Sequence, residues 1–131
     1  ENVTYLGNVS NAEALASYMA SDFVLTYYEP GSHINCYAES NKWGDAIKIG
    51  IGVIVNKEVK TASYLIDGGA ALSFYYEDTQ SLIRELKEYT LNPDKKNNIK
   101  SASSKLSGKF GYFEEQLQDL LFNSELLHEN S

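Results

Sequence analysis

The first feature of the chain is a set of short segments in which apolar and polar positions alternate. Alternation with a period of two places the apolar side chains on one face of a strand. It is most regular at residues 46–55, whose apolar positions would line one face of a central strand. The pattern predicts strands at residues 3–6, 23–28, 33–39, 46–55, 59–66 and 71–76.

Apolar positions spaced by three and four residues predict helices in the remaining segments. Ser10 and Glu13 have the spacing of a capping box, so a first helix is expected at about residues 11–22. Asp78 can cap a second helix. A last helix is expected at residues 112–128.

These elements predict an α+β fold with a single domain at residues 1–131. Asn56-Lys57-Glu58 and Asp67-Gly68-Gly69 have the composition of hairpin turns. We therefore expect a mostly antiparallel sheet of four to six strands, with N- and C-terminal helices packed on it. The register of the hairpin formed by residues 59–66 and 71–76 stays open, because a two-residue turn and a bulged three-residue turn place opposite faces inward.

The predicted core combines one helix face from each end of the chain with the dense face of the sheet. Residues 93–109, rich in Lys, Ser and Asn, lack periodicity and are expected to form a flexible loop. The expected core residues are Leu15, Met19, Phe23, Ile47, Ile49, Ile51, Val53, Tyr64, Ile66, Leu117, Leu120 and Leu121.

Length and charge restrict the function. The chain has 131 residues and a net charge of -7, which disfavours direct binding to nucleic acid or to an anionic membrane surface and favours a basic protein partner. The charge is uneven, since residues 93–109 carry +4 and residues 110–131 carry -5. No apolar run is long enough to span a bilayer.

The cysteine content bears on the compartment. Cys36 is the one cysteine and cannot form an internal disulfide, so a reducing compartment and a cytoplasmic location are expected. A signal peptide removed before Glu1 stays an open alternative.

Catalytic and metal-binding constellations are not evident in the sequence. On a strand, His33 and Cys36 would point to opposite faces and could not meet at one ion or in one dyad. The Gly-Lys segment at residues 107–111 lacks the first glycine and the final hydroxyl residue of a phosphate-binding loop. Glu77 and Asp78 are more typical of a helix cap than of paired catalytic carboxylates. We therefore expect a protein that is not an enzyme and has no cofactor.

The last predicted helix carries the sharpest local signal for binding. At 100° per residue, an aromatic side chain, Phe122, falls in the middle of an acidic arc opposite the apolar stripe. Such an anchor with a charged rim is typical of a surface that binds a basic protein. The alternative is that Phe122 packs inside the molecule. The candidate partner-binding residues are Glu114, Glu115, Gln118, Asp119, Phe122, Glu125 and Leu126.

Three functions are compatible with these features. The first is a non-enzymatic acidic protein that neutralises a basic partner, such as an immunity protein against a toxic nuclease or a phage-encoded inhibitor. The second is a small-molecule-binding or enzymatic domain with a pocket between sheet and helices, lined by Trp43, Tyr37 or Tyr75 and approached closely at Gly50 and Gly52. The third is a structural subunit that forms a homodimer through a second apolar sheet face.

Overall fold

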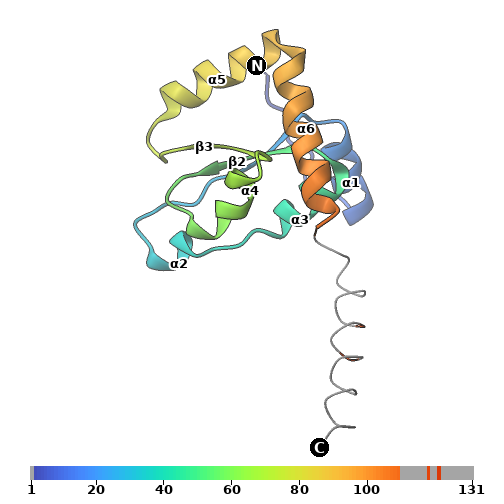
Figure 1. Ribbon diagram of the computed structural model, residues 1–131, viewed down its shortest axis with the longest axis horizontal. Helices are drawn as coiled ribbons and strands as arrows, with labels where there is room; N and C mark the ends of the chain where they lie inside the picture. The colour runs from blue at the N-terminus through green and yellow to red at the C-terminus, as the bar shows by residue number, and fades with distance from the viewer. Residues whose placement is uncertain (1, 110–117, 119–120, 122–131) are drawn as a thin grey trace, which may run out of the picture.

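A computed structural model of the protein describes residues 2–109, 118 and 121. Short strands and helices alternate along this part of the chain (Figure 1). The elements are α1 (Asn11–Met19), β1 (Phe23–Thr26), α2 (His33–Cys36), α3 (Asn41–Ile49), β2 (Gly52–Asn56), the 3-10 helix η1 (Lys60–Ala62), α4 (Ser63–Asp67), β3 (Ala71–Phe74), α5 (Thr79–Leu91) and α6 (Pro93–Ser107).

The sheet has three parallel strands in the order β1-β2-β3. Ile54 is central in the register, because it pairs with Leu25 on one side and with Leu72 on the other. The predicted antiparallel sheet of four to six strands is therefore wrong. Parallel neighbours need a crossover rather than a tight hairpin, and helical segments supply both crossovers here.

Helices cover both faces of the sheet. Val53 and Val55 of β2 pack with side chains of α3 and α4 on one face, whereas Ile54 packs with α5 and α6 on the other. Figure 1 shows α5 and the upper part of α6 on one side of the strands and α4 on the opposite side. Every residue of β2 is buried, as is typical of a strand in a parallel sheet covered on both sides.

Helix α3 occupies much of the segment that alternation assigned to a central strand. Its N-cap is Ser40, whose hydroxyl accepts a hydrogen bond from the backbone N–H of Lys42. Trp43, Ala46 and Ile47 are buried at helical spacing. Gly50 ends the helix with a φ of +82°, a left-handed conformation that favours glycine. The prediction of one strand over residues 46–55 is thus wrong. Residues 46–49 form the end of α3, Gly50 terminates that helix, and residues 52–55 belong to the shorter strand β2.

Three other predicted strands are also absent from the described residues. Residues 59–66 form η1 and most of α4, and residues 33–36 form α2. Residues 3–6 are exposed and form no strand. Residues 56–58 lead into the crossover formed by η1 and α4, and residues 67–69 lead into the parallel strand β3. Neither predicted hairpin therefore forms. The register of a hairpin between residues 59–66 and 71–76 is no longer a question.

Several predictions at single elements are confirmed. The Ser10–Glu13 capping box begins α1, and the Asp78 carboxylate accepts a hydrogen bond from the Ser81 N–H at the start of α5. Strands form at 23–26 and 71–74 within the predicted ranges.

The predicted core is partly confirmed. Ile47, Ile51 and Val53 are buried, but Met19 is 72% exposed and Leu121 is 58% exposed, so these two are wrong. The other predicted residues among those described are partly buried; Leu117 and Leu120 lie outside the described residues.

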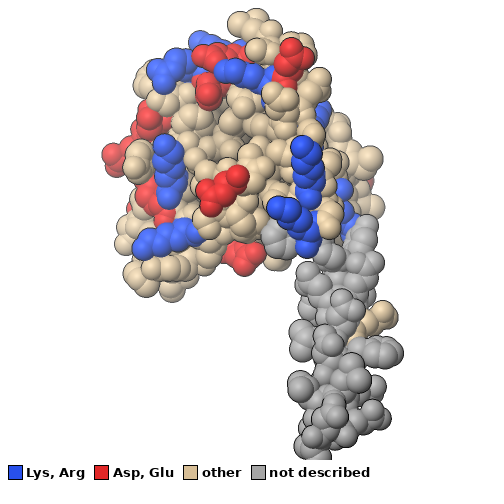
Figure 2. Space-filling model, viewed as in Figure 1, with Lys and Arg blue, Asp and Glu red and all other residues tan. Residues whose placement is uncertain are grey.

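Charge is nearly balanced over the main part of the chain that the structure describes. Residues 2–109 hold eleven basic and twelve acidic side chains, a net charge of -1. Both signs are interspersed on the face shown in Figure 2. The strong acidity of the sequence therefore comes from residues 110–131 and from Glu1.

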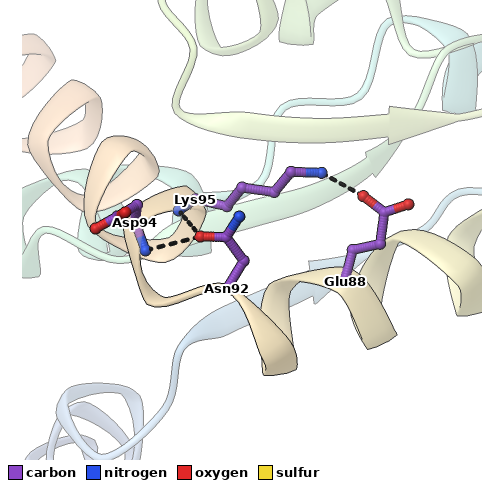
Figure 3. A network of polar contacts seen from close by, with 4 residues as sticks. All are labelled: Glu88, Asn92, Asp94 and Lys95. Carbon is purple, nitrogen blue, oxygen red and sulfur yellow. Dashed lines mark hydrogen bonds and ion pairs between the residues drawn. The ribbon is translucent and has the colours of Figure 1, made fainter.

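Residues 93–109, expected to form a flexible loop, are mostly the helix α6. The Asn92 side chain caps this helix by accepting hydrogen bonds from the N–H groups of Asp94 and Lys95, and Pro93 occupies the first turn (Figure 3). Lys95 also pairs with Glu88 of α5 across the turn between the two helices. An asparagine cap and a proline in the first turn both favour a helix start. The prediction of a loop was based on the polar composition of residues 93–109 and did not use these two signals.

Buried contacts hold α6 against β2. Ile99 packs beside Ile54, and the buried Ser103 hydroxyl donates a hydrogen bond of 2.9 Å to the carbonyl of Ile51. Lys96 and Lys100 both pair with Asp22 just before β1. These two bridges outweigh the burial of Asp22, which would raise its pKa, so the pKa of this carboxyl lies below its ordinary value. None of the helices in the described part of the chain is long and apolar enough to cross a membrane.

Candidate functional site

The three strands end at the same edge of the sheet, because they are parallel and adjacent in register. Aromatic and charged residues follow each strand at this point. Figure 1 shows α2 and the start of α5 on the side of the molecule where the strands end. We call this region the carboxyl edge; it comprises Tyr27, Tyr28, Asn56, Lys57, Glu58, Tyr75 and Tyr76.

Asn56 joins the end of β2 to the segment that follows β1. Its side chain is completely buried. Its Oδ1 accepts a hydrogen bond of 2.9 Å from the Tyr28 N–H, and its Nδ2 donates one of 3.0 Å to the Tyr28 carbonyl. The Asn56 amide thus adds two hydrogen bonds between the end of β2 and the segment that follows β1. It fixes the direction in which the chain leaves β1.

Glu58 joins the same point to the segment after β3. Its carboxylate accepts hydrogen bonds from the Tyr76 N–H at 3.0 Å and from the Asn56 side-chain amide at 2.9 Å. Burial of Glu58 would raise its pKa, but these hydrogen bonds outweigh the burial and hold the pKa below its ordinary value. The carboxylate stays charged at neutral pH and connects all three strand ends through Asn56.

Tyr27 lies beneath this network. Its ring contacts that of Tyr76, with 6.0 Å between the centroids. Its hydroxyl is buried and has no hydrogen-bond partner among the described residues. Burial, together with the negative charges of Glu58 and Asp78, raises its pKa. A buried hydroxyl without a partner is uncommon and marks a position where a further polar group would be stabilising.

Two lysine–tyrosine pairs follow the strand ends. Lys57 and Tyr75 belong to the carboxyl edge, whereas Lys60 of η1 and Tyr37 at the end of α2 lie outside its defining residues. The Nζ of Lys57 lies 5.2 Å from the centroid of the Tyr75 ring. The Nζ of Lys60 lies 5.2 Å from the centroid of Tyr37 and donates a hydrogen bond of 3.2 Å to its hydroxyl. All four side chains are exposed. Cations held over aromatic rings are constrained in position while remaining open to solvent.

The predicted partner-binding surface falls almost entirely beyond the described residues. Gln118 is described; it is helical and exposed. The remaining members of that surface are outside the described part of the chain and stay a prediction: Glu114, Glu115, Asp119, Phe122, Glu125 and Leu126.

The residues predicted to line a pocket are not brought together. Trp43 is completely buried and its indole Nε1 donates a hydrogen bond of 2.7 Å to the Thr26 hydroxyl. Gly50 is the stop of α3, and a Cβ on Gly52 would collide with Phe23 and Ile99. These three residues serve the core. Only the exposed tyrosines of that set lie near the carboxyl edge.

His33 and Cys36 lie on the short helix α2 rather than on a strand. The His33 ring packs against Tyr37, with 5.0 Å between the centroids, while the Cys36 thiol donates to the Pro30 carbonyl at 3.7 Å. The prediction that His33 and Cys36 point to opposite faces of a strand is therefore wrong, because these residues form a helix. Among the described residues, no three His, Cys, Asp or Glu side chains are grouped as a metal site requires.

The sequence interpretation missed Asn56, Lys57, Glu58 and Lys60, because it assigned the first three to a hairpin turn. Two signals could have located them. Tyrosine pairs occur at the ends of two predicted strands, and a polar Asn-Lys-Glu segment directly follows the most apolar one. Polar and aromatic residues at successive strand ends are what a parallel sheet gathers at one edge.

Comparison of the chain with protein-family models, curated proteins and solved structures finds no match. Its function is therefore argued from this geometry.

Proposed function

We propose that the protein is a small-molecule-binding domain whose ligand binds at the carboxyl edge. One observation supports this most strongly: three parallel strands end together at a cluster of tyrosine, lysine, asparagine and glutamate side chains. In open sheets with parallel strands, ligands bind outside the carboxyl ends of the strands where the strand order reverses. The order β1-β2-β3 contains no reversal, so the proposal rests on the side chains gathered at this edge. Loops held by a rigid sheet are also the usual location of binding residues.

The hydrogen bonds of Asn56 and Glu58 support the proposal, since they hold the loops after β1 and β3 in fixed positions. A site that is ordered before binding loses less entropy when its ligand arrives. The buried Tyr27 hydroxyl adds one unused polar group next to these loops.

The proposal is tested by mapping fragment binding on isotope-labelled protein by NMR. We expect small aromatic and polar fragments to shift the amide signals of Tyr28, Lys57 and Tyr75 more than those of the opposite edge at Gly50 and Gly69. Shifts concentrated at the opposite edge would contradict the proposal.

A pair of tyrosine variants provides the matched control. Tyr75→Ser removes an exposed ring of the carboxyl edge, whereas Tyr5→Ser removes a ring that is 90% exposed in the N-terminal segment. The first should weaken the binding of fragments and the second should not. Equal effects would mean that the fragments bind exposed rings without selectivity.

A second proposal concerns the acidic C-terminal segment. The net charge of -5 at residues 110–131, beside a nearly neutral remainder, favours binding of this segment to a basic protein. The protein would then act as a non-enzymatic inhibitor in the cytoplasm, where Cys36 stays reduced. Removing residues 110–131 should abolish binding of a basic partner and leave fragment binding at the carboxyl edge intact.

A further inference from the structure

We infer that the Tyr27 hydroxyl donates a hydrogen bond to a neutral oxygen of the ligand, such as a carbonyl oxygen. This inference rests on the proposed ligand site at the carboxyl edge and specifies one contact that the ligand makes there. Tyr27 directly follows β1, which ends at Thr26. Its hydroxyl oxygen is buried and has no hydrogen-bond partner among the described residues. Such a group is rare in folded proteins, because it loses its hydrogen bonds to water and gains none in return.

The chain on both sides of Tyr27 is held in a fixed position. On one side, the Thr26 hydroxyl is buried in the core and accepts a hydrogen bond of 2.7 Å from the Trp43 indole. On the other side, the N–H and the carbonyl of Tyr28 both bind the Asn56 amide. The position of Tyr27 is therefore set before a ligand arrives, which reduces the entropy lost on binding.

The two carboxylates near the Tyr27 hydroxyl already bind amide donors. Glu58 accepts a hydrogen bond of 3.0 Å from the Tyr76 N–H. Asp78 caps α5 by accepting one of 3.1 Å from the Ser81 N–H. Neither carboxylate lies within hydrogen-bond distance of the Tyr27 hydroxyl. A partner for this hydroxyl therefore comes from outside the part of the chain that the structure describes.

The charges around Tyr27 determine which ligand atom fits. Burial, together with the negative charges of Glu58 and Asp78, raises the pKa of Tyr27, so its hydroxyl keeps its proton at neutral pH and acts as a donor. Although burial of Glu58 opposes the shift, amide hydrogen bonds hold the pKa of both carboxyls below their ordinary values, and both are ionised. These charges repel a further anion. A neutral carbonyl oxygen accepts from the hydroxyl without this cost.

The tyrosine that carries this hydroxyl reaches the surface of the carboxyl edge. Tyr27 as a whole is only partly buried, and Tyr75 of the same edge is 60% exposed. Binding then requires side-chain rotation at the edge, which is common when proteins bind partners, and leaves the core closed. The rings of Tyr27 and Tyr76, with 6.0 Å between their centroids, provide apolar contact for the body of the ligand.

Acetophenone is a suitable probe because it carries a neutral carbonyl group, and benzoate is its anionic counterpart. Both are titrated into the full chain and followed by the amide shifts of Tyr28, Lys57 and Tyr75. Acetophenone should bind more tightly than benzoate. Benzoate binding of equal or higher affinity at this edge would overturn the inference and leave the ligand site standing. Absence of shifts at the edge with both probes would overturn the inference and the ligand site together.

Replacement of Tyr27 by phenylalanine tests the hydroxyl itself. Tyr27→Phe should weaken acetophenone binding by about fivefold, which corresponds to about 1 kcal/mol for one hydrogen bond. The matched control is Tyr89→Phe, since the Tyr89 ring lies on the same face of the sheet but packs against Phe23 at the start of β1. This control should leave acetophenone binding unchanged. Unchanged binding in Tyr27→Phe, or an equal loss in the control, would overturn the inference.

The stability of the same variant distinguishes an unused hydroxyl from one that already has a partner. Without ligand, Tyr27→Phe should be at least as stable as wild type in urea unfolding, because the change removes a buried polar group that makes no hydrogen bond. A lower urea midpoint for Tyr27→Phe would show that a bound water or another part of the chain already accepts from the hydroxyl. That result would overturn the inference.

Discussion

Asn56 and Glu58 organise the carboxyl edge, because each side chain contacts backbone groups of a neighbouring loop. Asn56 satisfies both the N–H and the carbonyl of Tyr28, and Glu58 accepts from the Tyr76 N–H. A buried backbone group that loses its partner costs about 1–3 kcal/mol. The two side chains therefore stabilise the folded protein as well as positioning the loops after β1 and β3.

The depressed pKa of Glu58 predicts a defined dependence of stability on pH. Because the unfolded chain binds this proton more tightly than the folded one, the stabilisation by Glu58 is complete above its unfolded value near 4.5 and is lost as the pH falls through the lower folded pKa. The free energy of unfolding should thus be lower for Glu58→Gln at neutral pH, and the difference from wild type should shrink below pH 4.5. Urea unfolding at a series of pH values measures this.

An exposed carboxylate at the same edge serves as the control for that experiment. Glu77→Gln should change the free energy of unfolding at neutral pH by less than about 0.5 kcal/mol, as exposed substitutions do. If Glu58→Gln gives the same stability as wild type at all pH values, the hydrogen bonds of Glu58 do not stabilise the fold.

At the scale of elements, helix starts could be predicted from local chemistry, while strand pairing could not. Ser10 with Glu13 and Asp78 with Ser81 form the caps that their spacing indicates. The alternating isoleucines at 47, 49 and 51 misled the interpretation, because a strand and a helix that ends in glycine can share this pattern. Gly50 in its left-handed conformation was the decisive residue. The buried residues of α3, which are Trp43, Ala46 and Ile47, have the spacing of three and four residues that is typical of a helix.

Two glycine substitutions in and after α3 should have opposite effects. Gly50→Ala forces alanine into a φ of +82° and brings its Cβ to 2.9 Å from the Ser104 hydroxyl oxygen. We expect a loss of about 1–2 kcal/mol in the free energy of unfolding. Gly44→Ala, in the exposed interior of the helix with no atom near its Cβ, should add about 1 kcal/mol. Thermal unfolding of both variants checks the pair. A gain at both positions would mean that α3 continues through Gly50.

At the scale of the whole molecule, the acidic charge and the candidate ligand site occupy different parts of the chain. Composition correctly indicated an acidic protein, but the composition of the whole chain could not show that residues 2–109 carry a net charge of only -1. Nor could it place Tyr27, Lys57 and Tyr75 together, because this follows from the parallel direction of the strands. The direction depends on how the crossovers pack, which is a tertiary property that local patterns do not contain.

The role of Phe122 in the acidic segment is tested by measuring stability and binding on one variant. If Phe122 is the anchor for a basic partner, Phe122→Ala should weaken that complex by about 2 kcal/mol or more, mainly through faster dissociation. The free energy of unfolding should stay within about 0.5 kcal/mol of wild type, as for surface substitutions. Charge reversal at Glu115 and Asp119 should instead slow association.

A loss of roughly 3–5 kcal/mol in the stability of Phe122→Ala would show that the ring packs internally. Unchanged affinity of the folded fraction would then remove this segment from the partner-binding site.

The parallel direction of the strands is the claim on which the ligand site at the carboxyl edge depends, and methyl NMR tests it directly. In the parallel register, Ile54 lies between Leu25 and Leu72, so methyl contacts should connect Ile54 with both leucines. The antiparallel arrangement would instead place Ile51 opposite Tyr64 and Ile49 opposite Ile66. We predict contacts from Ile54 to Leu25 and Leu72 in selectively labelled protein. Contacts that pair Ile51 with Tyr64 and Ile49 with Ile66, without those of Ile54, would contradict the account.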